Sequence, residues 1–436
     1  MKLNRLSIKL KIIPIFLFSL FILSLSCSSC KKDKDKNKDF DLLNTNHLRY
    51  LYETIELSGD TNLGIVHIYC EYPDYNFTIE PNEGFTCVDD VARAMRVNFS
   101  ILNDITSDEM YFYMPDFLLY MQAPNGYFYN FMWGDYTINK TYQTSVPEPN
   151  WWSWRALWAL SGYPANYHYT SGRVRQALNK LTENIYNEYL EIPMDIETIE
   201  GIEIPAWLPH GAAGDQAGLL IVGLEQYYRN VNKDERVLQL IERFADGLLI
   251  MQKGDSTTFP YGAYLSWNNI WHAYGNMQAY AMLRAGKLLE RDDYIQSALI
   301  EIDNFYPYLI EQNYLSHFSI KKNENEFEIL EMEQFPQIAY GFRPMVWASI
   351  EACKVKQDVK YLRQAEKIAG WFAGDNIANQ MMFDPYVSGR CYDGIISPGN
   401  VNLNSGAEST IEALLTMNQF ITIGYVVNWS SIYEKH

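Results

Sequence analysis

The chain has 436 residues and a formal net charge of −18 at pH 7, and 15% of its residues are aromatic, including 33 Tyr and 11 Trp. So acidic a chain repels nucleic acid and anionic lipid headgroups, which excludes nucleic-acid binding as its function. The abundant tyrosine and tryptophan suit a cleft in which aromatic rings stack on the C–H faces of sugars.

Residues 1–26 are expected to be a lipoprotein signal peptide. An apolar run over residues 12–25 follows a basic start and, at about 14 residues, is too short to span a bilayer. It ends in Ser24-Leu25-Ser26-Cys27, which resembles a bacterial lipobox with Ser24 where leucine is commoner. Cys27 is therefore the expected lipidation site and Cys30 a second candidate, while a plain secretory signal is the alternative.

A charged tether is expected over residues 27–40. Residues 31–39 contain no apolar side chain, so this run cannot repay the entropy of ordering. Removing residues 1–26 deletes four basic residues and no acid, which takes the formal charge from −18 to −22. We expect a lipid-anchored protein of the bacterial cell envelope, at the outer membrane, with one domain over residues 41–436; its leaflet and oligomeric state stay open.

Apolar residues at helical spacing predict an all-α domain. About twelve segments fit a helix: 41–57, 88–104, 108–123, 149–162, 171–190, 213–230, 234–251, 270–289, 292–312, 336–354, 358–373 and 406–423. Twelve helices in six consecutive hairpins indicate an (α/α)6 toroid. An irregular α-solenoid is the alternative, but no fixed-period repeat supports it. The long polar loops 124–150 and 375–405 are expected to build a cleft at one end.

The first chemically interesting segment enters a helix with paired aspartates, Asp89 and Asp90. With Thr86 as N-cap, Asp89 fits a capping box, so capping is as good an explanation as function. Asp90 lies in the first helical turn, where the helix dipole favours an ionised carboxylate suited to a general base or nucleophile. Arg93 lies within i+3 and i+4 reach of both acids.

A second loop enters a helix near the C-terminus. Ser405 is its expected cap and Glu408 occupies the capping-box position. The preceding loop gathers Asp393, Arg390 and Asn402, and loops so rich in polar groups often bind ligands.

Aromatic residues recur at helical spacing in two places. Trp267, Trp271 and Tyr274 would share one face of a helix, as would Trp151 and Trp154 with Trp158. Core packing is the ordinary explanation for such stripes. As sugar-stacking candidates we retain Trp133, in the loop 124–150, with Trp151, Trp154, Trp267, Trp271 and Tyr274.

Other chemistries find no support. The chain has no GxSxG, glycine-rich phosphate loop or HExxH motif, and its seven histidines show no metal-ligand spacing, so neither metal nor cofactor is expected. His210 to Asp215 is better explained as a loop entering a helix than as a metal site. Cys70 and Cys87 could form a disulfide, but four buried free thiols, with Cys353 and Cys391, are the preferred interpretation.

Several motifs together resemble a known family. They are Gly84-Phe85-Thr86-x-x-Asp89-Asp90-x-Ala92-Arg93-Ala94, Trp371-Phe372-x-Gly374-Asp375-Asn376, Phe383-Asp384-Pro385, Gly389-x-Cys391-Tyr392-Asp393-Gly394 and Gly406-Ala407-Glu408-Ser409-Thr410. The set is similar to the helical domain attached to some bacterial glycosyltransferases, a member of the six-hairpin glycosidase superfamily. This resemblance implies the (α/α)6 fold over most of the chain.

A looser likeness to family 9 cellulases implies chemistry. By that analogy Asp90 or Asp89 activates water and Glu408 protonates the leaving oxygen, with Asp393 next in line as the acid. The expected function is a glycoside hydrolase using two carboxylates. A toroidal polysaccharide lyase using Asn269, His272 and Tyr274 with Arg343 or Arg390 is an alternative. A non-catalytic glycan-binding lipoprotein is another.

The lipobox resemblance predicts that Cys27→Ser abolishes lipid labelling and releases the protein into a soluble fraction. Metabolic labelling with a radioactive fatty acid, followed by fractionation, measures both. Labelling that is lost only in Cys30→Ser would move the anchor to Cys30, and labelling that survives both substitutions would remove it.

Overall fold

The computed structural model describes residues 42–59, 61–97, 109–163, 171–324, 326–425 and 427. One compact unit runs from Asp41 to His436. The predicted signal peptide, the tether with Cys27 and Cys30, and the predicted helical residues 98–104 lie outside the described part of the chain.

Twelve α-helices lie in the described residues. The first six are α1 (Asn46–Leu51), α2 (Val88–Ala94), α3 (Glu109–Tyr120), α4 (Trp151–Ser161), α5 (Ser171–Tyr189) and α6 (Gly214–Asn230). The others are α7 (Glu235–Met251), α8 (Gln278–Leu289), α9 (Asp292–Glu311), α10 (Arg343–Lys356), α11 (Lys360–Ala373) and α12 (Ala407–Thr422).

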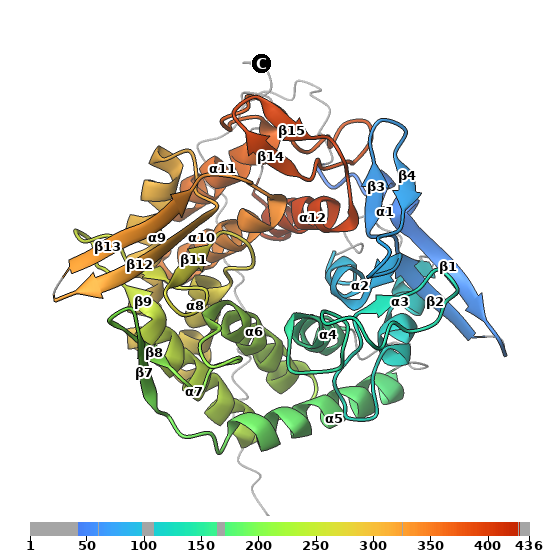
Figure 1. The fold of residues 1–436 in the computed structure, drawn as a ribbon, viewed down its shortest axis with the longest axis horizontal. Coiled ribbons are helices and arrows are strands. Elements are labelled where there is room, and N and C mark those ends of the chain that lie inside the picture. The colour runs from blue at the N-terminus through green and yellow to red at the C-terminus, as the bar shows by residue number, and fades with distance from the viewer. Residues whose placement is uncertain are drawn as a thin grey trace, which may run out of the picture. The chain divides into compact units, whose positions relative to one another are not determined.

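The even-numbered helices form a closed inner ring. Each of α2, α4, α6, α8 and α10 packs against the next, and α12 packs against α2 to complete the circle (Figure 1). The helices α3, α5, α7, α9 and α11 lie outside the ring, each packed on its hairpin partner, while α1 packs against α12. The predicted (α/α)6 toroid is confirmed.

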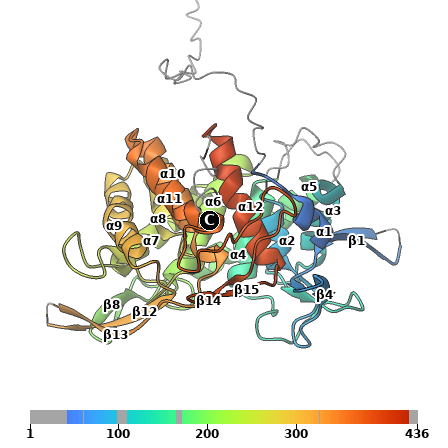
Figure 2. The same cartoon turned by 90° about the horizontal axis from the view of Figure 1, so that it is seen from above.

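The inner helices all begin at the same end of the toroid, where the strand hairpins also gather (Figure 2). Six positive helix ends therefore converge on one mouth, which favours acidic side chains in the first turns. Asp89, Asp90, Asp215 and Glu408 occupy such positions.

Local sequence explains the outer helices well. In α7 the buried residues Val237, Leu240, Ile241, Phe244 and Leu248 form one stripe against the inner ring. Asp234 precedes this helix, and its side chain accepts a hydrogen bond from the Arg236 amide, which satisfies one of the free N–H groups at the helix start.

Four predicted helices were too long, and one of them is the segment 88–104, in which α2 ends at Ala94 and residues 95–97 form a turn. Residues 52–57 form strand β1 (Tyr52–Leu57), which pairs with β2 (Thr61–Val66), so only 46–51 of the segment 41–57 is helical. Residues 270–272 form β11 (Ile270–His272), and Gly275 then takes a φ of +75° that ends any helical path before α8. In the segment 336–354, the helix α10 begins only at Arg343, with Pro344 in its first turn.

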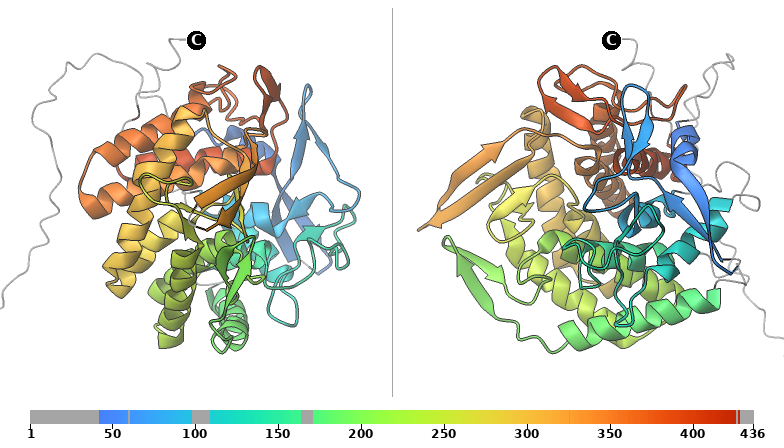
Figure 3. Two further views of the ribbon diagram at one scale, coloured as in Figure 1. Left: turned by 60° about the vertical axis from the view of Figure 1, so that its left-hand side comes forward. Right: turned by 45° about the vertical axis from the view of Figure 1, so that its right-hand side comes forward.

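Short strands lie at the mouth of the all-α ring. β3 (Tyr69–Glu71) pairs with β4 (Asn76–Thr78), β5 (Thr86–Cys87) with β6 (Phe131–Met132), β7 (Ile196–Ile199) with β8 (Ile202–Pro205), β9 (Gln252–Lys253) with β10 (Ala263–Tyr264), and β14 (Gly394–Ser397) with β15 (Asn400–Asn402). β11 joins β12 (His317–Asn323) and β13 (Glu326–Glu333) in a three-stranded sheet whose β12–β13 hairpin projects outward (Figures 1 and 3).

Two further properties bear on the sequence expectations. Cys70, Cys87, Cys353 and Cys391 are all free thiols, with Cys353 only partly buried, so the Cys70–Cys87 disulfide does not form. Within the described ranges, none of the helices combines the length and the apolar character that crossing a bilayer requires.

A buried acid in α9 makes stability depend on pH. Glu301 is buried, and burial raises its pKa from 4.5 to about 8, while the Tyr264 amide is its one backbone hydrogen-bond donor and acts in the opposite direction. Between those two pH values, the folded state holds a proton that the unfolded chain has released. The stabilising contribution is therefore complete below pH 4.5 and is lost as the pH rises through 8.

We predict that Glu301→Gln flattens this dependence, because glutamine still accepts from Tyr264 and never ionises. Its stability relative to the wild type should rise from pH 5 to pH 8, by up to about 1.4 kcal/mol per pH unit. Urea unfolding midpoints at pH 5, 6.5 and 8 measure the difference. A constant difference across this range would show that Glu301 titrates alike in both states.

Candidate functional site

A cavity of about 680 Å³ opens at the mouth of the ring, at the N-terminal ends of α4 and α6. This volume falls in the range typical of small-ligand sites. It is lined by Asn150, Trp151, His210, Ala213, Asp215, Gln216, Trp267, Ile270, His272, Tyr274, Ser316 and His317.

Aromatic rings wall this cavity. The side chains of Trp267 and Tyr274 are each 45% exposed, and Trp151 at the start of α4 is half-buried. A Cβ atom at Gly275 would lie 2.9 Å from the Trp151 ring and 3.2 Å from the Tyr340 hydroxyl, so only glycine permits this close approach. Three of the predicted sugar-stacking residues, Trp151, Trp267 and Tyr274, therefore meet in one cavity.

The cavity also holds an imidazole–carboxylate pair. His272 Nε2 lies 2.9 Å from Asp215 Oδ2, and the Tyr274 ring stacks on the imidazole with centroids 3.7 Å apart. Partial burial raises the pKa of Tyr274, and the charge of Asp215 adds to this shift. Sequence reasoning placed His272 only in the lyase set. It placed Asp215 in the first turn of the predicted helix 213–230 but gave it no role in the site.

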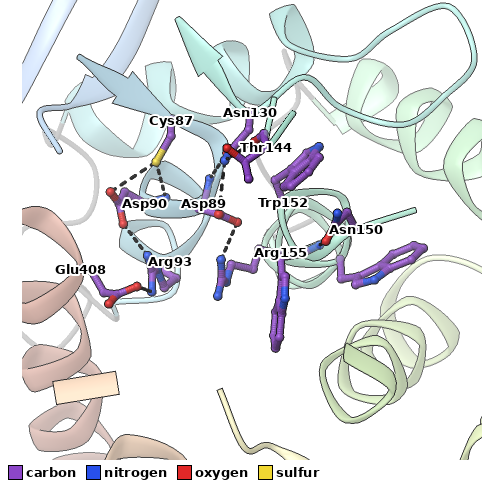
Figure 4. Close-up of polar contacts among 12 residues, drawn as sticks. Cys87, Asp89, Asp90, Arg93, Asn130, Thr144, Asn150, Trp152, Arg155 and Glu408 are labelled. Atoms are coloured by element: carbon purple, nitrogen blue, oxygen red, sulfur yellow. Dashed lines mark hydrogen bonds and ion pairs between the residues drawn. The ribbon is translucent and has the colours of Figure 1, made fainter. Parts of the chain in front are cut away.

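A second polar centre lies where α2 meets α12 (Figure 4). Arg93 Nη2 donates to Asp90 Oδ1 at 2.6 Å, and Arg93 Nη1 donates to Glu408 Oε2 at 2.7 Å. Glu412 lies 3.6 Å from the same Nη1 and is held from its other side by Arg343 at 2.5 Å. The structure thus brings Asp90 and Glu408 onto one guanidinium.

Glu408 does not cap its helix. The N-cap of α12 is Gly406, which makes no side-chain cap bond, and the Glu408 carboxylate turns to Arg93 instead. Its side chain is 42% exposed. The atoms packed around the carboxyl act to raise its pKa, but Arg93, Arg155 and Arg343 outweigh them and hold the pKa below its usual value. Glu408 is therefore an accessible, ionised carboxylate, where the sequence predicted a protonated acid.

Asp90 has the opposite environment. Its carboxyl is buried, accepts from the Cys87 thiol at 3.3 Å, and lies beside Arg93. Burial raises its pKa, and the charge of Arg93 opposes this shift, so burial acts against the helix dipole that the sequence predicted would favour the ionised form. A reacting group must touch substrate, and this carboxyl is closed off. The N-cap of α2 is Cys87 and not the predicted Thr86, and the Cys87 side chain accepts a hydrogen bond from the Asp90 amide.

Asp89 links the two centres. Its Oδ1 pairs with Arg155 at 2.6 Å, and Arg155 Nη2 donates to the Tyr340 hydroxyl at 2.8 Å. The Arg155 guanidinium also covers the rings of Trp151 and Tyr340, each at 5.1 Å. Asp89 thus makes an ion pair in place of the predicted capping box, and Tyr340 connects the carboxylates to the cavity wall.

Asp393 lies beside Glu408 at the start of α12. Its Oδ1 accepts from the Gly406 amide at 2.8 Å and from the Ser409 hydroxyl at 2.7 Å. Burial raises its pKa, and although these two hydrogen bonds oppose the shift, the negative charge of Glu408 adds to it. Asp393 and Glu408 are thus neighbouring carboxyls with opposite preferences for the proton.

The other predicted residues lie elsewhere. Trp154 and Trp271 are core residues rather than cleft residues: Trp154 donates to Gln216, and Trp271, on strand β11 rather than a helix face, packs on Phe318. Trp158 is core as well. Three further predicted residues do not line the cavity. They are Trp133 in the turn after β6, Arg390 over the Tyr75 ring, and Asn402 in β15.

The residues of the lyase alternative are not gathered. Arg343 is buried against Glu412, Arg390 stacks on Tyr75, and the Asn269 side chain donates to the Ile320 carbonyl. Only His272 and Tyr274 of that set share the cavity.

The fold and this mouth define the chain as an (α/α)6 toroid with an aromatic, carboxylate-bearing cleft, as the resemblance to six-hairpin glycosidases implied. Among solved structures it is similar to cellobiose 2-epimerase from Bacillus thermoamylovorans, with a TM-score of 0.59 and 11% identity over 85% of this chain and 95% of that one. It is also similar to a sugar epimerase from a ruminal bacterium, with a TM-score of 0.56 and 13% identity over 87% and 96%.

A third similar structure is a family 76 glycoside hydrolase from a bovine strain of Bacteroides thetaiotaomicron, with a TM-score of 0.55 and 9% identity over 89% of this chain and 78% of that one. At such identities the likeness establishes the shared fold. No family model matches the chain, and no curated protein matches it in sequence.

The Arg93 centre predicts a large difference between two substitutions. Arg93→Met removes the counter-ion of buried carboxyls and should lower the free energy of unfolding by about 3–5 kcal/mol. Asp90→Asn keeps the shape of the side chain and replaces a carboxyl whose pKa burial already raises. It should lower the free energy of unfolding by less than about 2 kcal/mol. Urea unfolding at pH 7 compares them, and equal losses would show that Asp90 is the ionised partner that Arg93 requires.

Proposed function

We propose that the protein is a carbohydrate-active enzyme, a glycoside hydrolase acting at the mouth of the toroid. The observation that carries this proposal is the pair Glu408 and Asp393. The Glu408 side chain is 42% exposed and arginines lower the pKa of its carboxyl, whereas burial raises the pKa of the partly buried Asp393. Neighbouring carboxyls with divergent pKa values are the arrangement that acid–base cleavage of a glycosidic bond needs.

The roles differ from those predicted from the sequence. Glu408 acts as the base that removes a proton from the attacking water, or as the nucleophile. Asp393 donates its proton to the glycosidic oxygen as the bond to the anomeric carbon breaks. The Asp393 hydrogen bonds described above all reach Oδ1, which leaves Oδ2 to carry that proton. Arg93 and Asp90 position Glu408 without touching substrate.

The aromatic cavity supplies the binding surface. Trp267, Tyr274 and Trp151 offer apolar faces beside polar groups, the combination that fixes a sugar ring in place. The chain's net negative charge favours neutral glycans. The similar structures include a glycoside hydrolase, which supports a carbohydrate substrate. Lipid anchoring through Cys27 at the outer membrane is part of this proposal.

A sugar isomerase or epimerase is the second candidate, and the His272–Asp215 pair favours it. An imidazole oriented by a carboxylate is a suitable general base for moving a proton at carbon near neutral pH. Two of the similar structures are epimerases. The two chemistries leave different products, because hydrolysis creates a new reducing end, whereas isomerisation in heavy water places deuterium on a sugar carbon.

We predict that Glu408→Gln folds and binds glycan but loses turnover by about a hundredfold or more. Product formation from a panel of neutral oligosaccharides, followed by chromatography and reducing-end assay, measures the loss, and circular dichroism checks the fold. His272→Asn is the matched comparison and should retain hydrolysis of the glycosidic bond.

The reverse pattern, in which His272→Asn is inactive and Glu408→Gln is active, would transfer the chemistry to the imidazole and support the isomerase. Glycan binding by the wild type without any turnover would instead support a non-catalytic binding lipoprotein.

A further inference from the structure

A second aromatic surface lies away from the cavity, where α1 meets the β3–β4 hairpin. We define the hairpin platform as Tyr50, Tyr72, Tyr75 and Phe77. Three of these side chains are well exposed: Tyr72 by 54%, Tyr50 by 49% and Phe77 by 38%. Isolated exposed aromatics are ordinary, but a contiguous group indicates a binding surface.

The platform is rigid. Phe77 stacks on the His67 ring with centroids 3.9 Å apart, and Tyr50 lies 4.9 Å from Phe77. The Tyr50 hydroxyl donates to the Tyr75 carbonyl at 2.9 Å, and the Tyr72 and Tyr75 rings meet edge to face at 6.0 Å. Rings held in this way lose little entropy when a ligand binds.

Arg390 completes the support. Its guanidinium lies 3.9 Å from the centre of the Tyr75 ring, which gives this predicted sugar-binding residue a place outside the cavity. The Tyr72 amide also donates to Asn404 Oδ1 at 3.0 Å. The hairpin is therefore fixed to the loop that leads into α12 and Glu408 (Figures 1 and 2).

Strand register defines which side chains share the platform's face of the hairpin. Phe77 pairs with Cys70, so these two side chains share one face. Tyr69 pairs with Thr78 on the other face, and its hydroxyl donates to Glu83.

The charges around the platform select a class of ligand. Glu71 and Asp74 are exposed on the hairpin, and Glu53 pairs with His67 at 2.8 Å. Burial lowers the pKa of His67, and it lowers the pKa of His47 behind Tyr50 to about 4, so both rings are neutral at pH 7. Arg390 against Tyr75 is a cation at the platform, but the exposed acids around the neutral aromatic faces outnumber it. These faces therefore match the C–H faces of neutral sugars better than anionic glycans or anionic lipid.

We propose that the hairpin platform is a second binding site for a neutral polysaccharide, which holds a polymeric substrate beside the cleft. The inference rests on the proposed function for the identity of the polymer as substrate. A chain bound at the platform raises the local concentration of its neighbouring bonds at Glu408, as in any two-site attachment. Short oligosaccharides, which cannot reach both sites, gain nothing from it.

Affinity electrophoresis of the full chain tests binding, with Glu408→Gln present in every variant so that the polymer is not degraded. The gels contain hydroxyethylcellulose, yeast mannan, amylose or polygalacturonate. Tyr72→Ala and the double variant Tyr72→Ala/Phe77→Ala should weaken binding to at least one neutral polymer about tenfold. The matched control is Tyr120→Ala, an exposed tyrosine of α3 outside the platform, which should bind like the parent.

Tyr72→Ala alone keeps the test valid if loss of Phe77 disturbs the packing on His67. With Glu408 restored, Tyr72→Ala should cleave short oligosaccharides at the wild-type rate and the bound polymer several-fold more slowly. Suppose that the wild type cleaves no glycan while the Tyr72→Ala substitution still weakens polymer binding. That result would contradict the proposed function and would support the platform as a binding site.

Several results would overturn the inference. They are equal retardation of the parent and both platform variants, no retardation of the parent by any neutral polymer, and preferential binding to polygalacturonate. A platform-dependent effect seen only with phosphatidylcholine vesicles, or only as dimer formation in light scattering, would likewise reassign the surface to a membrane or to a second copy.

Discussion

The buried guanidinium of Arg93 is the interaction on which the rest of this structure depends. It joins the first inner helix, through Asp90, to the last, through Glu408 and Glu412. The Nη1 and Nη2 atoms of this buried arginine meet carboxylates, although its Nε has no hydrogen-bond partner in the described part of the chain. The contact that holds the seam of the ring therefore also lowers the pKa of Glu408.

Much of the fold was predictable because local patterns determine it. Amphipathic stripes such as that of α7 set the helix count and most boundaries. Residues 52–57 and 270–277 departed from the prediction because strand pairing and a positive-φ glycine, which periodicity does not encode, ended those helices. At the site, the sequence singled out Asp90 and Glu408, and the structure places both against Arg93. The contact with Arg93, which lowers the pKa of Glu408, could not be foreseen because the two residues are 315 positions apart and only the closed ring brings them together.

The mouth of the toroid holds two groups of polar side chains. Glu408 and Asp393 lie at one side, the His272–Asp215 pair lies in the cavity at the other, and Tyr340 with Arg155 lies between them. Because the inner helices all start at this end, their dipoles stabilise the ionised form of acids there. The arrangement explains how one scaffold serves hydrolases and epimerases alike: the ring fixes where side chains converge, and the loops decide which of them meets the sugar.

The β12–β13 hairpin has a consequence for the protein's behaviour at high concentration. β13 is the free edge of its sheet, and an open edge carrying Ile329, Leu330 and Met332 invites pairing with another chain. Glu326, Glu328, Glu331 and Glu333 lie along the same strand. Two such edges brought together would align eight carboxylates in close opposition. Repulsion between these carboxylates thus opposes the pairing of two such edges into a larger sheet.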